Sequence, residues 1–320
     1  MNRSLPSVDD LVDAAAAGQP RAVARLISLV ENGGAQLREV VSRLSPATGR
    51  AHMVGLTGPP GVGKSTTTSA LVTVLRADGL RVGVLAVDPS SPFTGGALLG
   101  DRVRMQVHAH DREVFIRSMA SRGHLGGLAV ATVQALRVFD LAGCDVTLVE
   151  TVGVGQSEID VAAACDSCAV LFAPGMGDGI QAAKAGIIEI ADLFVVNKAD
   201  RDGTSSLVRE LRTTVGLPEP GGWRVPIVQA VATTRAGIDE LWATVVEHRS
   251  WAEASGAWEQ RRLARAGAEI QALALGQLRR RLSTATGPAA RLAAAVRDGS
   301  LDPYTAADEL VAQLGGLSAR

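Results

Sequence analysis

Short apolar runs alternate with longer amphipathic segments along the middle of the chain. The apolar runs between residues 53 and 228 lack inner alternation, which is typical of strands buried on both faces. The segments between them carry apolar residues at helical spacing. We therefore predict an α/β fold in which helices cover both faces of a mostly parallel sheet. The predicted strands are Met53–Leu56, Arg81–Val87, Val114–Ile116, Val146–Val149, Ala169–Ala173, Leu193–Val196 and Pro226–Val228.

Helical patterns flank this central region on both sides. They divide the chain into an N-terminal helical segment (1–50), a sheet-containing domain (51–249) and a C-terminal helical arm (250–320). Right-handed crossovers place the carboxyl ends of parallel strands on one edge of the sheet, where such sheets bind ligands. The predicted helices are two within Ser7–Asn32, then Leu37–Leu44, Thr66–Arg76, Leu128–Leu141, Trp251–Leu282, Ala289–Arg297 and one from Pro303 to Leu314.

The composition narrows the class of partner. Hydrophobic residues make up 47% of the chain and aromatic residues only 3%, so the core must be mainly aliphatic. A formal net charge of -1 gives no reason to expect nucleic acid or an anionic membrane as the main partner. No apolar run reaches the roughly 18 residues of a membrane span, and the first residues do not have the pattern of a signal peptide.

Three cysteines bear on the compartment. Cys165 and Cys168 have the spacing of a metal or redox pair, but no second pair lies nearby, so we interpret them, like Cys144, as structural thiols. Few cysteines and no export signal predict a cytoplasmic location. The basic run Arg279–Arg281 is interpreted as a solvated helix face.

A glycine-rich stretch after the first predicted strand carries the strongest chemical signal. Gly58 to Ser65 fits G-x-x-x-x-G-K-[ST], the phosphate-cradling P-loop, and a predicted helix follows it. The glycines let backbone N–H groups approach phosphate oxygens. Lys64 would place a cation on the β- and γ-phosphates, and the Ser65 hydroxyl would ligate Mg²⁺. The expected phosphate-binding residues are Gly58, Pro59, Pro60, Gly61, Val62, Gly63, Lys64, Ser65 and Thr66.

A second motif selects the base. Asn197-Lys198-Ala199-Asp200 follows a predicted strand. A carboxylate at Asp200 can accept hydrogen bonds from guanine N1–H and from the exocyclic amino group, whereas adenine would leave it unpaired. The chain is therefore expected to bind GTP and GDP.

Glu150 to Gly153 follows the predicted strand Val146–Val149 and occupies the place of a metal-binding and switch segment. Glu150 would hold Mg²⁺ directly or through water, and the Gly153 amide would contact the γ-phosphate. Val154 follows Gly153 where Ras-like enzymes have a water-positioning Gln, and Gln156 is displaced by two positions. We predict slow intrinsic hydrolysis that rises when a partner completes the site.

Two aspartates flank the loop after the second predicted strand. Asp88 and Asp101 are both candidates for contact with Mg²⁺ or the attacking water, because this loop begins at the ligand-binding edge. The alternatives are a turn residue before Pro89 for Asp88, and an ion pair with a neighbouring arginine for Asp101. The sequence leaves open which of the two touches the metal.

Six strings resemble the MeaB/ArgK family, the methylmalonyl-CoA mutase-associated GTPases. The likeness spans nearly the whole chain, and its two longest strings are the most specific. The strings are Gly58–Ser65, Val87–Pro92, Arg117–Gly127, Glu150–Glu158, Pro174–Asp178 and Asn197–Asp200.

This resemblance implies a P-loop GTPase of the SIMIBI class that forms a homodimer through its C-terminal helices. Such proteins act as chaperones of adenosylcobalamin-dependent acyl-CoA mutases. They gate cofactor loading from a cobalamin adenosyltransferase and protect the mutase from inactivation. Methylmalonyl-CoA mutase is the default client, and the sequence does not identify it further.

The resemblance also implies roles for single residues. Asp178 to Lys184 is similar to the family's third switch, and Lys184 would approach the nucleotide when the partner docks. Family members carry Ser-Ala where this chain has Val231-Ala232, so the backbone amide that meets guanine O6 is kept but a hydroxyl is lost. The implied catalytic residues are Lys64, Asp88 and Lys184, and the implied metal shell is Ser65, Asp88, Asp101 and Glu150.

Other parts of the resembling strings suggest no chemistry. Arg117 to Gly127 has no role that we can derive, and His108 and His124 are interpreted as structural. Three other classes of protein compete with this interpretation: an ATP-dependent kinase of amino-acid transport, a nickel-insertion GTPase and a structural dimer with a vestigial site. Asp200 argues against ATP, the scattered histidines argue against nickel, and the intact P-loop argues against a vestigial site.

Overall fold

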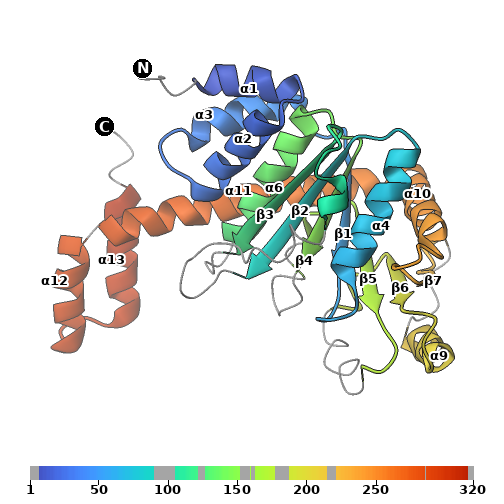
Figure 1. The fold of residues 1–320 in the computed structure, drawn as a ribbon. Helices are drawn as coiled ribbons and strands as arrows, with labels where there is room; N and C mark the ends of the chain where they lie inside the picture. The colour runs from blue at the N-terminus through green and yellow to red at the C-terminus, as the bar shows by residue number, and fades with distance from the viewer. Residues whose placement is uncertain are drawn as a thin grey trace. The chain divides into compact units, whose positions relative to one another are not determined.

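The computed structural model describes residues 7–89, 105–121, 127–151, 159, 163–176, 187–214, 221–284 and 286–315 of the 320-residue chain. Seven strands form one sheet in the order β3-β2-β4-β1-β5-β6-β7, and each neighbouring pair runs parallel (Figure 1). This confirms the predicted α/β fold. The strands are β1 (His52–Thr57), β2 (Val82–Pro89), β3 (Val114–Ser121), β4 (Val146–Thr151), β5 (Ser167–Phe172), β6 (Leu193–Asn197) and β7 (Ile227–Ala230).

Helices cover both faces of this sheet. Alternate side chains of each strand reach opposite faces, as in β4, where Leu148 packs with α4 and α10 while Val149 packs with the N-terminal helices and α6. Figure 1 shows α1, α2 and α3 gathered beside α6. The helices and short 3₁₀ turns are α1 (Val8–Ala16), α2 (Pro20–Asn32), α3 (Leu37–Leu44), η1 (Ser45–Ala47), α4 (Lys64–Ala77), η2 (Gln106–His108), α6 (Gly127–Leu141), α9 (Thr204–Thr214), α10 (Ile238–Ser255), α11 (Ala257–Thr284), α12 (Thr286–Arg297) and α13 (Pro303–Gly315).

Three elements differ from the sequence prediction by more than their end residues. β3, predicted as a short strand over Val114–Ile116, continues to Ser121. The long helix expected over Trp251–Leu282 is divided, because Gly256 has a φ of 80° and ends α10 in the left-handed conformation. The prediction also missed α9, which buries Leu207 and Leu211 over β5 and β6. The spacing of those two leucines, one helical turn apart, was the available signal.

The chain divides into two compact units, residues 1–265 and 266–320. The first unit contains the whole sheet and the N-terminal helices. In the second unit α12 packs against α13. Within the described ranges, no helix is long and apolar enough to cross a membrane. The three cysteines are free and buried, and burial raises the pKa of the Cys165 thiol to about 12.

Where the strands begin, the sheet is held by buried polar contacts. The Ser167 hydroxyl lies 2.8 Å from His52 Nε2 and 2.7 Å from His248 Nδ1. His248 Nε2 in turn lies 3.2 Å from Asp192 Oδ1. All four side chains are at least nine-tenths buried, so this chain of contacts ties β1 and β5 to α10 away from water.

Two buried aspartates at the same edge bind the first turns of α11. Arg261 donates two hydrogen bonds to Asp192, at 2.6 and 2.8 Å. Arg262 and Arg265 both donate to Asp166. Burial alone would raise the pKa of Asp192, but the hydrogen bonds and charge of Arg261 hold it at about 2. The start of α11 is therefore fixed to the segments that lead into β5 and β6.

We expect His52 to make the fold sensitive to mild acid. Burial lowers the pKa of His52 from 6.5 to about 4, because the charged form is poorly solvated there. As the pH falls below 6.5 the unfolded chain takes up this proton first, so the free energy of unfolding should drop by up to about 3 kcal/mol by pH 4. His52→Gln keeps an N–H for Ser167 but does not titrate, and should lose less stability.

Urea unfolding at pH 7 and pH 4.5 measures this effect. Both pH values lie above the ordinary pKa of an aspartate, 3.8, and the stability that the lowered pKa of Asp192 contributes is lost only below that value, so this carboxylate contributes little to the change. His110→Gln is the control, because the His110 side chain is exposed. Equal losses of stability in the wild type and in His52→Gln would contradict the assignment.

Candidate nucleotide-binding site

The loop between β1 and α4 is shaped by glycines at two close approaches. Gly58 has a φ of 134°, and a Cβ there would lie 2.3 Å from the Leu171 carbonyl oxygen. Gly63 has a φ of 98°, and a Cβ there would lie 2.4 Å from Asn197 Nδ2. Only glycine fits both the conformation and the space at these positions, so the loop passes directly against β5 and β6.

Lys64 is the first residue of α4, and its side chain folds back over this loop. Its Nζ donates hydrogen bonds to the carbonyl oxygens of Gly58, at 2.5 Å, and Pro59, at 3.1 Å. Only 6% of the residue is exposed. The cation therefore lies at the helix N-terminus, inside the loop that the sequence predicted to bind phosphate.

Glu150, at the end of β4, meets two hydroxyls of α4. Ser65 Oγ donates to Glu150 Oε1 at 2.5 Å, and Thr68 Oγ1 lies within hydrogen-bonding distance of Glu150 Oε2, at 3.0 Å. Ser65 and Thr68 are three residues apart, so they share one face of the helix. The carboxylate is 2% exposed. This brings together the predicted metal ligands Ser65 and Glu150 and adds Thr68, which sequence reasoning missed.

Asn197, at the end of β6, joins the two halves of the site. Its Nδ2 donates to the Val62 carbonyl oxygen at 2.8 Å, and its Oδ1 accepts from the Ala232 N–H at 3.1 Å. Lys198 has a φ of 56°, and its Nζ donates to the Gly61 carbonyl oxygen at 2.7 Å. These contacts fix the phosphate loop against the loop that follows β7.

A pocket of about 120 Å³ lies between these loops. Asp200 is exposed at this pocket, with its carboxylate available to a base. The N–H groups of Val231 and Ala232 donate to Ala236 and Asn197, so the backbone amide expected to meet guanine O6 at this place has a partner within the protein. The lining residues are Gly63, Thr66, Asn197, Lys198, Asp200, Arg201, Val231, Ala232 and Thr233.

Arg201 and Thr233 line this pocket and were not predicted. Arg201 directly follows the predicted residue Asp200, and Thr233 directly follows the predicted residue Ala232. Their positions next to predicted residues were the signal that the sequence offered. Thr68 could have been found from its spacing to Ser65 on the same helix.

Several predicted residues lie outside the described part of the structure. They are Asp101, Gly153, Asp178, Lys184 and the side chain of Asp88. The backbone of Asp88 pairs with Ala120 in β3, which places this residue at the carboxyl end of β2. Their roles stay predictions.

Other candidates from the sequence take part in packing contacts. His108 Nε2 lies 3.0 Å from the Ser69 carbonyl oxygen, next to α4. Arg117, in β3, donates to Ser28 Oγ at 2.6 Å. The described residues include no group of His, Cys, Asp and Glu side chains that could hold a metal by themselves.

Comparisons with known proteins agree on one family. Residues 23–287 match the family described as methylmalonyl-CoA mutase-associated GTPase MeaB. A Pyrococcus abyssi protein, a GTPase by name, is 47% identical over 97% of this chain and 98% of its own length. The Escherichia coli protein named GTPase ArgK is 37% identical over 76% of each chain.

Two further likenesses bear on the function. The mouse protein named methylmalonic aciduria type A homolog, mitochondrial, is 37% identical over 78% of this chain and 65% of its own length. A crystal structure titled LAO/AO transport system kinase superposes with a TM-score of 0.71 and 25% identity, over 98% of this chain and 100% of the other.

We expect Gly63→Ala to weaken binding of GDP by about 10- to 100-fold. The new Cβ would displace the Asn197 amide and break its two hydrogen bonds, which are worth about 1 kcal/mol each. Gly79→Ala is a matched control, because Gly79, in the turn after α4, also has a positive φ, of 78°, but a Cβ there meets nothing within 4 Å and the residue lies outside the site. Titration with a fluorescent GDP analogue measures both variants. Equal affinities of the two would show that the Asn197 contact does not matter.

Proposed function

Because the chain belongs to the methylmalonyl-CoA mutase-associated GTPase family, we propose that it is a GTP-hydrolysing chaperone of an adenosylcobalamin-dependent acyl-CoA mutase. It would gate loading of adenosylcobalamin and protect the mutase from inactivation. One observation carries the proposal: Asn197 joins the phosphate-binding and base-binding loops into one nucleotide site. The chain that contains this site belongs to a family described as associated with methylmalonyl-CoA mutase. The name of the mouse relative, which refers to methylmalonic aciduria, agrees with it. A cytoplasmic location fits the three free cysteines.

In this proposal each described loop has its own role. The backbone N–H groups of the glycine loop and the Lys64 cation bind the phosphates. Asp200 selects guanine, and Asn197 keeps the base-binding and phosphate-binding loops in register. Asp88, Asp101, Gly153 and Lys184 would complete the reaction centre.

The residues around Ser65 suit Mg²⁺. A hydroxyl and a carboxylate oxygen lie 2.5 Å apart, and both are the hard oxygen donors that this ion prefers. A bound Mg²⁺ would supply positive charge against the negative charge that develops during phosphoryl transfer. Ser65 would contact the ion, and Glu150 would hold it directly or through water. Thr68 would keep the Glu150 carboxylate oriented toward it.

A homodimer through the C-terminal helices is a further part of the proposal. Helix α11 exposes several large aliphatic side chains. Exposed apolar side chains grouped on one helix are typical of a protein–protein contact surface. These side chains are Leu263 (75% exposed), Ile270 (67%), Leu275 (57%) and Leu278 (48%).

The alternative is a kinase of an amino-acid transport system. It is favoured by one observation, the similar crystal structure titled LAO/AO transport system kinase. Asp200 opposes it, because a carboxylate at the base pocket finds no pair of donors on adenine. Displacement of bound GDP by ATP as readily as by GTP would favour the kinase.

We expect Thr68→Val to raise the Mg²⁺ concentration needed for tight GDP binding by several-fold. The substitution keeps the shape of the side chain but removes the hydroxyl next to Glu150 Oε2, so the carboxylate loses an anchor. Affinity in EDTA should be unchanged, and Thr68→Ser should restore the wild-type value. Thr73→Val is the control, because Thr73 lies on the same helix but donates to the Ser69 carbonyl oxygen. An equal loss with and without Mg²⁺ would contradict a role through the metal.

We expect the chain to co-purify with methylmalonyl-CoA mutase in at least one nucleotide state. The tagged chain is mixed with purified mutase in GDP or in a non-hydrolysable GTP analogue, and bound mutase is quantified. Lys64→Ala tests whether the complex depends on nucleotide. Absence of complex in both states, with isobutyryl- and ethylmalonyl-type mutases also tested, would reject the chaperone proposal.

The same samples test two other parts of the proposal. Gel filtration should show the chain eluting as a dimer, and a monomer would contradict the role given to α11. Single-turnover GTP hydrolysis should be slow without mutase and faster with it. Fast hydrolysis by the chain alone would contradict the predicted slow switch.

A further inference from the structure

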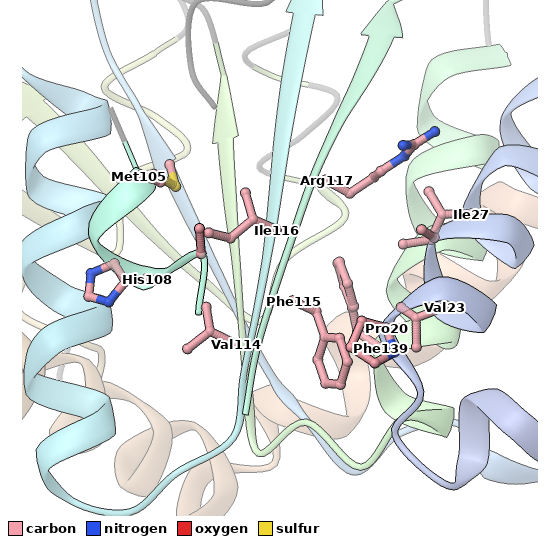
Figure 2. A pocket seen from close by; sticks show the side chains of 12 residues that line it. Pro20, Val23, Ile27, Met105, His108, Val114, Phe115, Ile116, Arg117 and Phe139 are labelled. Carbon is pink, nitrogen blue, oxygen red and sulfur yellow. The ribbon is translucent and has the colours of Figure 1, made fainter. Parts of the chain in front are cut away.

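A second cavity, of about 280 Å³, lies against the edge strand of the sheet. Its lining includes four consecutive residues of β3, from Val114 to Arg117. Consecutive strand residues point to opposite faces of a sheet. A cavity that touches all four must therefore lie along the outer edge of β3 and extend over both faces. Figure 2 shows the lining side chains standing on both sides of the strand.

The two walls of this groove are largely apolar. Met105 and His108, in and next to η2, form the wall on the side of Val114 and Ile116 (Figure 2). Ala109, which follows His108 in the chain, also lines the cavity. Next to them Val107 is 85% exposed. The other wall comes from α2, with Phe115 and Phe139 behind it. The α2 residues are Pro20, Val23, Ala24 and Ile27.

Between these walls the strand presents unpaired backbone groups. Val82 N–H donates to the Glu113 carbonyl oxygen, and this sets which residues of β3 face β2. In a parallel ladder alternate residues direct both backbone groups to the neighbour. Phe115 and Arg117 therefore bond to β2, and Ile116 directs its N–H and carbonyl outward. Within the described residues, these Ile116 groups have no hydrogen-bond partner outside the strand ladder.

The charges around the groove are mainly positive. Asp111 and Glu113 are paired with Arg76 and Arg81. Two exposed arginines that lie next to lining residues or to β3 in the sequence have no described ion pair, and these are Arg21 on α2 and Arg112 just before β3.

We propose that this groove binds an extended segment of a partner protein, which adds a strand to the edge of β3. Backbone hydrogen bonds to Ile116 would hold the segment, and its alternate side chains would enter the two apolar walls. The arginines favour acidic residues at its ends. At about 3.3 Å per residue, Val114 to Arg117 offers room for about four residues of the segment. The groove lies toward the amino end of β3, whereas the nucleotide loops follow the carboxyl ends of the strands, so this proposal does not depend on the proposed function.

Selection from a display library of random linear peptides tests the proposal with the full chain as target. The enriched peptides should carry apolar residues at alternate positions and Asp or Glu at the flanks. A synthetic copy of one such peptide should bind with fluorescence anisotropy as the readout, and Ala24→Glu and Ala109→Glu should each weaken it at least tenfold. These variants change different segments of the lining, and Ala109 is exposed, so at least one should fold normally. Ala243→Glu, on an exposed part of α10, is the matched control.

Hydrogen exchange separates strand addition from ordinary apolar binding. The bound peptide should slow exchange of the Ile116 amide, and a peptide N-methylated along its backbone should bind at least tenfold more weakly. The proposal is overturned if no peptide family is enriched, if enriched peptides ignore both lining variants, or if Ile116 is not protected. The proposal is also overturned if no peptide is enriched and Ala24→Glu changes the oligomeric state of the chain. That result would mean that the groove binds a second copy of the chain.

Discussion

The side-chain amide of Asn197 is the contact on which the nucleotide site depends. Its nitrogen holds the Val62 carbonyl of the phosphate loop, and its oxygen holds the Ala232 N–H of the loop after β7. One planar group thus fixes the distance between the places that bind phosphate and base. Gly63 is part of the same constraint, since any side chain there would occupy the space of the amide. The strand order makes this possible, because β1 and β6 are both neighbours of β5 and end at the same edge.

Different interactions stabilise the opposite side of the sheet, where the amino ends of the strands lie. There, buried carboxylates of Asp166 and Asp192 accept several hydrogen bonds each from arginines of α11, and removing one partner would leave a buried charge. Such contacts specify a geometry more than they add stability. The amino ends of the strands are therefore suited to hold α11 in place. The carboxyl ends of the strands carry glycine loops with polar contacts instead.

The sequence predicted most of this architecture and part of the site. Unalternating strands such as Val146–Val149 are dictated by burial on both faces, so local pattern was enough. The P-loop residues Lys64 and Ser65 were found because phosphate binding constrains neighbouring residues. The spacing of Thr68 to Ser65 places it on the same helix face, but its contact with Glu150 joins residues 82 positions apart. The contact of Asn197 with Ala232 joins residues 35 positions apart, and no local pattern encodes either pairing. The end of α10 was missed for the opposite reason, since a single glycine outweighed a long helical pattern.

Longer side chains need more anchors, and this explains the arrangement around Glu150. A glutamate has one more rotatable bond than an aspartate, so fixing its carboxylate costs more conformational entropy. Ser65 and Thr68 approach separate oxygens of Glu150, and the packed interior leaves it 2% exposed. Lys64 is likewise held by two loop carbonyls. When nucleotide and metal bind, these groups would exchange hydrogen-bond partners without first having to be ordered, and pre-organisation of this kind reduces the entropic cost of binding.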